Sequence, residues 1–385
     1  MINYGKHFID SSDIKYVTKT LNSNWLTQGP KVKIFENKLK KFLGSKYSLV
    51  VNSGTAALHL ACISIGLKKN DIVLTTPITF LSSINSALYL NAKPVFIDIN
   101  SKNYCLDLDK LEKKLRELKR RKKRVRALIV TDYAGQMCDW IRIKKLSKKF
   151  KFYTINDNCH SLGSKYYNDQ GYAVKFADIA THSFHPVKII TTGEGGCLST
   201  NNSEIYKKAI ELRSHGVIRT DNLKKRYGNW YYSMNSLGYN YRMPDVNASL
   251  GISQLKKIKK FIKKRKLIAK EYFNGFKSNK NIILPFIDKF CDHSFHLFPI
   301  QINFKNLRIS KKNFFNIMFK NGINLQVHYI PIHLQKYYRK KFYFPKNSLP
   351  EAEKFYSNAV SLPVYHSLDK KMVNKIIKNI NLLTK

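Results

Sequence analysis

The sequence predicts an α/β protein, with a mostly parallel sheet in a large domain and a smaller α+β domain towards the C-terminus. Short, fully apolar strands alternate with helical segments through the first two-thirds of the chain, and this alternation stops near residue 256. Apolar strands separated by helices are typical of a sheet covered on both faces. Polar and glycine-rich segments follow several of the strands, at the carboxyl ends where such sheets bind ligands.

The large domain is expected to span residues 1–255 and the smaller one residues 256–385. Six strands are predicted for the large domain, at Tyr47–Val51, Asp71–Thr76, Lys93–Ile99, Ala127–Thr131, Phe152–Asp157 and Ile179–Phe184. Their apolar character and the helical periodicity between them carry this assignment. The smaller domain begins with a long basic amphipathic helix and ends with a helix from about Asp369. No linker rich in glycine, serine or proline marks the boundary.

The chain has 385 residues and a large positive charge: 69 Lys and Arg residues against 25 Asp and Glu residues give +44. Such an excess is compatible with a nucleic-acid or anionic-surface partner. Only 13 of the basic residues are Arg, however, and Lys lacks the fork that reads phosphates and bases. Without a recognition motif, we prefer compositional drift towards Lys, Asn and Ile. The densest run, Lys113 to Arg126, is interpreted as the solvated end of a helix.

The six cysteines show neither pairing nor metal-like spacing, so we expect reduced thiols and no metal site. No stretch approaches the roughly 18 apolar residues of a membrane span. The N-terminus, MINYGKHFIDSSD, lacks the apolar region of a secretion signal. These observations predict a cytoplasmic protein with no membrane partner.

The first chemical motif is VNSGTAALHL, where a strand runs into a helix through Gly54 and Thr55. Free N–H groups at a helix start bind anions, and glycine lets the ligand approach the backbone closely. The alternative is an ordinary helix cap.

The second motif is SFHPVKIITTGEGG, in which Lys188 follows a strand. A buried lysine is costly unless it is neutralised or used covalently, and a Schiff base with an aldehyde cofactor does both. The alternative is a lysine that extends to solvent beside a plain glycine turn.

The third motif is TINDNCHSLG, with Asp157 at the end of a strand and His160 three residues later. A buried carboxylate needs a partner, and the protonated ring nitrogen of pyridoxal phosphate is one. A helix-capping aspartate is the alternative. In chain order the three motifs supply contacts for a phosphate, a pyridine nitrogen and an aldehyde. Phe80 could stack on a flat ring, although a core role is more common for phenylalanine.

These motifs occur in an order that resembles the DegT/DnrJ/EryC1/StrS sugar nucleotide aminotransferases. The resemblance covers essentially the whole chain, and it rests on WLTQGP, SGTAAL, PITF, AGQ, SFHPVK, GEGG, LRSHG and GYNYRM. It implies the aspartate aminotransferase-like fold, which is fold type I of the pyridoxal 5'-phosphate enzymes. It also implies a homodimer with active sites at the subunit boundary.

The resemblance assigns roles to individual residues. Lys188 matches the lysine that forms the Schiff base, Asp157 the partner of the ring nitrogen, and His160 a position near the cofactor 3-oxygen. Gly54, Thr55 and Ser183 match phosphate-binding positions, Phe80 the aromatic on the ring, and Asn240 a residue that reaches the phosphate from the other subunit. The positions that match sugar-nucleotide contacts are Tyr4, Asn24, Trp25, Leu26, Thr27, Gln326, Val327, His328 and Tyr329.

The C-terminal segments QVHYIPIH and SLPVY narrow the resemblance further. They are similar to family members that aminate a UDP-linked 4-keto-6-deoxy-N-acetylhexosamine with glutamate. The product is UDP-4-amino-4,6-dideoxy-N-acetyl-β-L-altrosamine, on the route to pseudaminic acid. Another 4-keto sugar, of the perosamine or bacillosamine type, is an alternative substrate. A nucleic-acid or anionic-surface binding protein, and a regulator without turnover, are the alternatives from other classes.

Two departures and one agreement qualify the match. Asn156 and Asn158 stand where an acid and a small residue are common, and Ile189 stands where a polar residue is frequent. The family's dehydratases carry histidine in place of the lysine, so Lys188 favours amino transfer.

Overall fold

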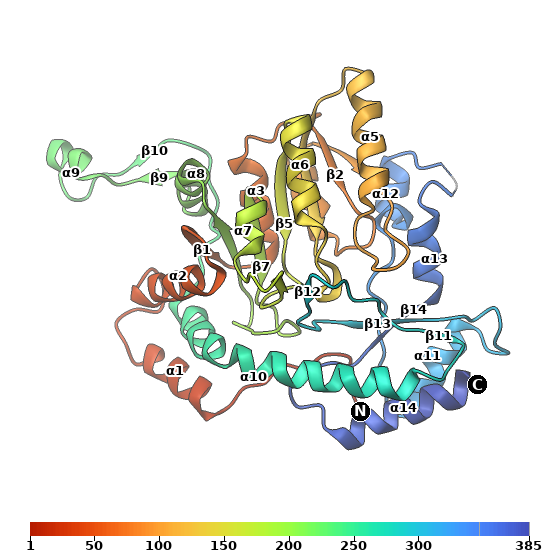
Figure 1. The fold of residues 1–385 in the computed structure, drawn as a ribbon. Coiled ribbons are helices and arrows are strands. Elements are labelled where there is room, and N and C mark those ends of the chain that lie inside the picture. Colours follow the sequence, from red (N-terminus) through yellow and green to blue (C-terminus); the bar gives the residue numbers. More distant parts are fainter. Residues whose placement is uncertain (346, 385) are drawn as a thin grey trace.

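A seven-stranded sheet forms the centre of the protein. The computed structural model describes residues 1–345 and 347–384. The strand order is β1-β8-β7-β5-β4-β2-β3, with helices on both faces (Figure 1). The strands are β1 (Tyr47–Val51), β2 (Ile72–Thr75), β3 (Lys93–Phe96), β4 (Val125–Thr131), β5 (Tyr153–Asp157), β7 (Ile179–Ser183) and β8 (Gly196–Thr200). All six strands predicted from the sequence are present within a few residues.

Within this sheet, β8 is the one strand that the sequence did not predict. It runs antiparallel to both of its neighbours, β1 and β7. The other neighbouring strands pair in parallel, which confirms the mostly parallel sheet. Gly196 opens β8 opposite Val51, and a side chain there would lie 2.4 Å from the carbonyl oxygen of Ser53. A glycine is therefore required where β8 passes the loop after β1.

The helices that flank this sheet follow the alternating pattern of the sequence. They are α1 (Ser11–Leu21), α2 (Pro30–Leu43), α3 (Gly54–Ser64), α4 (Ser82–Leu88), α5 (Leu108–Arg120), α6 (Trp140–Phe150), α7 (Tyr172–Phe176) and α8 (Ser203–Arg213). α3 is apolar on all sides and almost wholly buried, as a helix packed between the sheet and other helices must be. α5 instead has one buried stripe, made by Leu111, Leu115 and Leu118, with charged residues elsewhere.

A smaller lobe holds a three-stranded antiparallel sheet, β11-β13-β14. α12 (Lys336–Lys341) and α13 (Pro350–Asn358) come from the same stretch of the chain, but their buried residues belong to the core of the large lobe. The elements of the smaller lobe are β11 (Ile282–Ile283), β13 (Phe298–Ile302), β14 (Ala359–Leu362), α11 (Lys311–Lys320) and α14 (Lys370–Thr384). Both chain ends lie in this lobe (Figure 1), since Ile2 pairs with Ile323.

α10 (Asp245–Phe276) is 32 residues long and contains the predicted boundary at residue 255. The run of Lys and Arg residues predicted a helix that begins at about Lys256, and this predicted start is wrong. The eleven earlier residues, none of which is Lys or Arg, form the first third of the same helix, and this helix packs against α1 and α2. The division into two domains stays a prediction.

A narrow arm extends from the large lobe between α8 and α10 (Figure 1). It consists of the paired strands β9 (Val217–Ile218) and β10 (Ser233–Met234), with α9 (Asp221–Tyr227) between them. The short pair β6 (Lys165–Tyr166) and β12 (Cys291–Asp292) links the two lobes. Among the described residues, no helix is both long and apolar enough to cross a membrane.

Candidate active site

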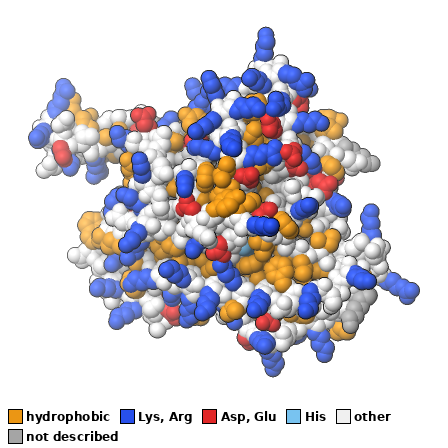
Figure 2. All heavy atoms as spheres, in the orientation of Figure 1, with side chains coloured by type: hydrophobic (Ala, Val, Ile, Leu, Met, Phe, Trp, Pro, Cys, Tyr) orange, Lys and Arg blue, Asp and Glu red, His pale blue; other side chains and the backbone are white. Residues whose placement is uncertain are grey.

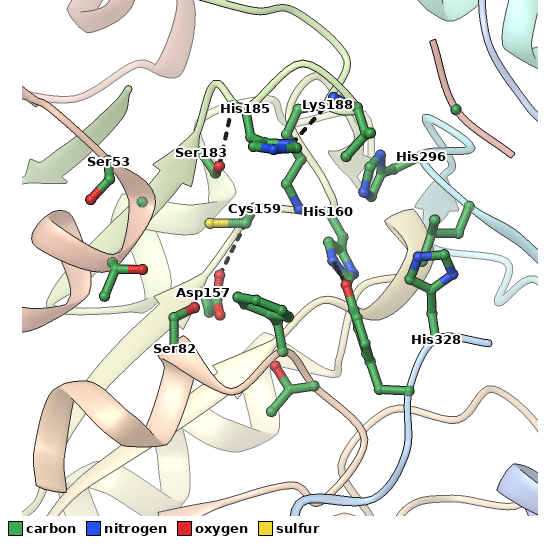
Figure 3. Close-up of a pocket in the computed structure, with 18 of the residues that line it drawn as sticks. Ser53, Ser82, Asp157, Cys159, His160, Ser183, His185, Lys188, His296 and His328 are labelled. Carbon is green, nitrogen blue, oxygen red and sulfur yellow. Dashed lines mark hydrogen bonds between the residues drawn. The ribbon is translucent and has the colours of Figure 1, made fainter. Parts of the chain in front are cut away.

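A cavity of about 420 Å³ lies at the carboxyl ends of β5 and β7 (Figure 3). The N-terminal segment and the smaller lobe complete its walls. The residues that line it are Tyr4, Gly5, Ser53, Gly54, Thr55, Thr79, Phe80, Ser82, Asp157, Cys159, His160, Ser183, His185, Val187, Lys188, Glu194, His296, Leu297, His328, Tyr329 and Val364.

The start of α3 forms one wall. Ser53 caps the helix by accepting a hydrogen bond from the Ala56 N–H at 3.1 Å. The N–H groups of Gly54 and Thr55 lie in the first turn, where no intrahelical acceptor exists. A side chain at Gly54 would lie 2.8 Å from the Cβ of Ser183. This wall is therefore suited to an anion held by backbone N–H groups and hydroxyls.

Asp157 ends β5 and is buried at 3% exposure. Its Oδ2 accepts hydrogen bonds from the hydroxyls of Ser83 and Thr131, and its Oδ1 accepts one from the Cys159 N–H at 3.3 Å. Three donors fix the direction of the carboxylate. Ser83, outside the cavity lining, is thus a supporting residue that the sequence did not reveal.

The side-chain contacts of Asn156 and Asn158 explain why these residues depart from the family pattern. Side chains alternate along a strand, so both point away from Asp157. Both amides donate to Asp132, at 3.0 and 3.2 Å, at the end of neighbouring β4. The Asp132 carboxylate also accepts hydrogen bonds from the Cys138 N–H, the Trp140 indole and the Tyr172 hydroxyl. Burial raises the pKa of Asp132 to about 6, and these hydrogen bonds oppose that rise.

Lys188 reaches into the same cavity. Figure 3 shows its side chain beside those of Asp157, Cys159 and His160, around one common space. Burial lowers the pKa of the Lys188 amine, while Cys159 and Asp157 oppose the shift. Within the described part of the chain, its Nζ has neither an ion pair nor a hydrogen-bond partner. A lowered pKa increases the fraction of the free amine, which is the nucleophilic form.

His160 and Tyr329 form a hydrogen-bonded pair on the opposite wall, with 2.9 Å between Nε2 and Oη. The Ala134 N–H donates to His160 Nδ1 at 3.4 Å, so the neutral ring carries its proton on Nε2. Burial, then Lys188 and His328, lower the pKa of His160 well below its usual range and keep the ring neutral. The Tyr329 hydroxyl accepts this proton and has its own hydrogen free to donate.

The structure brings most of the predicted cofactor residues together. Gly54, Thr55, Phe80, Asp157, His160, Ser183 and Lys188 all line the cavity, and so do Tyr4, His328 and Tyr329 from the predicted substrate set. Seven predicted residues do not line it: Asn24, Trp25, Leu26, Thr27, Asn240, Gln326 and Val327. Of these, Trp25 and Leu26 are more than half exposed.

Several lining residues were missed by the sequence reasoning. Ser53, Thr79, Ser82, His185 and Glu194 belong to motifs already singled out, so adjacency within those motifs could have found them. His296, Leu297 and Val364 come from the smaller lobe. No local pattern marks these three, because only the tertiary fold brings them to the cavity.

A strand-end carboxylate and a buried lysine amine beside a helix start, on such a sheet, define a fold type I aminotransferase. A solved structure supports the class: the one entitled Helicobacter pylori PseC, aminotransferase involved in the biosynthesis of pseudoaminic acid, superimposes with a TM-score of 0.90. It is 34% identical, and the match covers 100% of this chain and 99% of that one.

The family is shown by the sequence comparisons. The model of the DegT/DnrJ/EryC1/StrS aminotransferase family matches residues 7–381, so the chain belongs to that family. It is 39% identical to UDP-4-amino-4,6-dideoxy-N-acetyl-beta-L-altrosamine transaminase of Campylobacter jejuni, over 96% of this chain and 94% of that protein. GDP-perosamine synthase of Escherichia coli is 28% identical, over 95% of this chain and 94% of that protein. The expected enzyme class and fold are confirmed.

Proposed function

We propose that this protein is a pyridoxal 5'-phosphate-dependent transaminase of a UDP-linked 4-keto-6-deoxy-N-acetylhexosamine. Glutamate would be the amino donor and UDP-4-amino-4,6-dideoxy-N-acetyl-β-L-altrosamine the product. The observation that carries the proposal is the shared cavity of Lys188 and Asp157. Its anion-binding helix start, carboxylate and amine are three groups that this cofactor requires.

The residues of the cavity fit the cofactor. The Gly54 and Thr55 N–H groups and the Ser183 hydroxyl would hold its phosphate, and Asp157 would hold its ring nitrogen protonated. When bound, the cofactor supplies an electron sink for the carbon that loses its proton. Lys188 is the group in the cavity that can bind it covalently. Phe80 lines the wall where a flat ring would lie.

The proton transfers fall to residues of this chain. Lys188, with a pKa lowered by burial, is suited to take a proton from the substrate carbon and to return it to the cofactor carbon, which would lie two bonds away. Neutral His160 orients the Tyr329 hydroxyl through the 2.9 Å hydrogen bond. That hydroxyl can then donate towards an oxygen inside the cavity. Tyr4, whose ring centre lies 5.5 Å from that of His328, narrows the remaining opening.

The identity of the sugar nucleotide rests on the relatives. The Campylobacter jejuni protein and the Helicobacter pylori structure both carry names from pseudaminic acid chemistry, at 39% and 34% identity. The perosamine relative, at 28%, supports a GDP-linked 4-keto sugar as the second candidate.

Turnover assays separate these candidates. Purified protein would receive glutamate and one of three substrates: the UDP-linked 4-keto sugar, its C5 epimer, or the GDP-linked 4-keto sugar. We expect amination of the first at least about tenfold faster than the others, since buried polar contacts discriminate strongly. Product stereochemistry at C4 would be read by NMR. Preferential amination of the GDP-linked sugar would instead establish the second candidate.

We further propose a homodimer in which Asn240 acts on the partner's cavity. Asn240 is exposed, and its backbone lies against Asn52, behind the anion-binding loop. The adjoining arm exposes Trp230, Met234 and Leu237 by 59–79%. Exposed apolar residues of this size on a projecting arm favour burial against another copy.

Complementation between inactive variants tests this arrangement. Coexpressed Lys188→Ala and Asn240→Asp chains would form mixed dimers with one site free of both changes. If Asn240 acts across the interface, about a quarter of wild-type activity should return, as random pairing of two chains predicts. The matched control pairs Lys188→Ala with Asp157→Ala, whose residues belong to the same cavity and cannot complement. No recovery in the first mixture would contradict the action of Asn240 across the interface.

A further inference from the structure

A second hollow, of about 390 Å³, lies at the opposite edge of the sheet from the cavity. It is enclosed by the ends of α5 and α6 and by the loops that lead into β4 and β5. Its lining residues are Leu115, Lys119, Lys122, Lys123, Arg124, Val125, Lys149, Phe150 and Lys151. We call it the basic groove. Figure 2 shows Lys and Arg side chains crowded over α5 and α6.

Most of the charge in this groove is uncompensated. Lys149 pairs with Glu112 at 3.1 Å. For the part of the chain that the structure describes, the other five cations have no carboxylate within ion-pair distance. Cations at the ends of α5 and α6 complement the helix dipoles, but each helix end carries only about half a unit charge. Six converging cations exceed that need several-fold.

Two of the lysines occupy backbone positions that favour glycine. Lys122, just after α5, has φ of 53°, and Lys151, after α6, has φ of 56°. Helices commonly end in this left-handed conformation, and glycine is the usual residue there because a side chain is disfavoured. Here both positions instead direct a cationic side chain to the rim of one hollow.

The shape of the groove favours a compact ligand. Its floor is apolar: Leu115 and Val125 are 2% and 5% exposed, and Phe150 is half-buried. None of these residues projects outwards, so nothing is available for insertion into a bilayer. The volume lies within the ordinary range of small-molecule sites, about 300–1,000 Å³. A flexible lysine also acts as a point charge, which suits several phosphates better than one planar group.

The groove is separate from the catalytic cavity. Val125 is the first residue of β4, and Thr131, which contacts Asp157, is the last. Seven strand residues span about 20 Å. Its ligand would therefore not be the reacting sugar nucleotide at the cavity.

We propose that the basic groove binds the polyphosphate group of a small ligand, either inorganic polyphosphate or a nucleoside polyphosphate. The lysine amines and the Arg124 guanidinium would donate hydrogen bonds to the phosphate oxygens. This site is independent of the proposed transamination.

The test uses calorimetric titration of tripolyphosphate into full-length protein saturated with pyridoxal 5'-phosphate, so that the phosphate wall of the catalytic cavity is filled. The buffer would contain about 0.15 M salt, at which charges more than about 8 Å apart are largely screened. The groove variant is Lys122→Gln/Lys123→Gln/Arg124→Gln. The control variant, Lys259→Gln/Lys263→Gln/Lys270→Gln, removes the same three charges from exposed positions of α10.

We expect one tripolyphosphate per chain, at least about tenfold weaker in the groove variant and within about twofold of wild type in the control. ATP that binds more tightly than tripolyphosphate would identify a nucleoside polyphosphate as the preferred ligand, and ATP that binds equally or more weakly would identify inorganic polyphosphate. Equal weakening in both variants would overturn the proposal, because it shows attraction to net charge alone. Tripolyphosphate binding that is seen only at low salt would also overturn the proposal, because it would show an adventitious ion only. Many chains bound per DNA duplex, with no saturable tripolyphosphate site, would replace it with a nucleic-acid role.

Discussion

The two edges of the central sheet differ in how they use polar residues. At the carboxyl edge the carboxylates are short, buried and paired: Asp157 has three hydrogen-bond donors and Asp132 has five. At the amino edge the polar side chains are long, exposed and mostly unpaired, as in Lys122 to Arg124. The candidate active site therefore lies at the edge that has few charged side chains, where hydrogen bonds hold the carboxylates in place. The net charge of +44 says little about the cavity that defines the enzyme class.

The largest effect is expected from the amine of the cavity. Lys188→Arg should lower the turnover of sugar amination at least about a thousandfold, because removal of an obligatory covalent or proton-transfer group costs at least that much. The visible absorbance of the bound cofactor should change as well. Steady-state assays and an absorbance scan of the purified protein provide the measurement.

Lys207→Arg is the matched control, an exposed lysine on α8 for which we expect no change in turnover. Wild-type turnover in Lys188→Arg would show that the covalent role of this residue is wrong. It would also remove the main distinction drawn between the two sheet edges.

Asp132 should dominate stability at the carboxyl edge. Asp132→Ala would leave the amides of Asn156 and Asn158, among other donors, without an acceptor in a buried site. The expected loss is about 3–5 kcal/mol of unfolding free energy, as for the broken partner of a buried polar network. Urea denaturation followed by circular dichroism would measure it.

Asp221→Ala provides the comparison, since that carboxylate lies on exposed α9 and pairs with exposed Lys224. Exposed ion pairs contribute about 0–1 kcal/mol, so this variant should remain near wild type. Equal stability of both variants would show that the Asp132 network does not hold the ends of β4 and β5.

The pH dependence of Lys188 tests the electrostatic effect of Asp157 on its amine. Burial lowers the pKa of this amine, so its reaction with trinitrobenzenesulfonate in cofactor-free protein should begin at lower pH than that of exposed Lys270. The Asp157 carboxylate stabilises the ammonium form and opposes the shift. Asp157→Asn should therefore move the midpoint of Lys188 to still lower pH. Peptide mapping by mass spectrometry would follow the labelling of each lysine. An unchanged midpoint in the variant would show that the Asp157 carboxylate does not affect the pKa of Lys188.

The sequence predicted the carboxyl edge better than the rest of the molecule. Asp157 ends an apolar strand, and Gly54 and Lys188 follow other strands by three and five residues. Because parallel strands end at one edge, local patterns were sufficient to bring the three together. β8 was missed because it begins within the glycine cluster at Gly193 to Gly196, a composition that indicates a turn rather than a strand. The start of α10 was missed because its first eleven residues contain no Lys or Arg and so lack the basic character of the rest of the helix.

Contacts between distant segments could not be predicted in this way. His296 and Val364 reach the cavity from the smaller lobe. The hydrogen bonds that Asp132 accepts from Asn156 and Asn158 depend on the register between β4 and β5. The basic run itself was recognised, but not the hollow, since the end of α6 contributes Lys149 to Lys151 from elsewhere in the chain. Sequence patterns thus identify candidate residues within one helix, strand or loop. The packing of these elements against one another decides which residues share a site.

The smallest effect is expected at the amino edge. In protein without polyphosphate, Lys122→Gln/Lys123→Gln/Arg124→Gln removes mutual repulsion among exposed cations and should raise the unfolding free energy by at most about 0.5 kcal/mol, the usual range for surface changes. The gain should disappear near 1 M salt, where the screening length falls to about 3 Å. Thermal unfolding at low and high salt, with turnover measured in parallel, would test this. Turnover should stay within about twofold of wild type, because the groove lies a full strand length from the cavity. A large loss of turnover or stability would show that the cations of this edge are structural, and that the two edges are not independent.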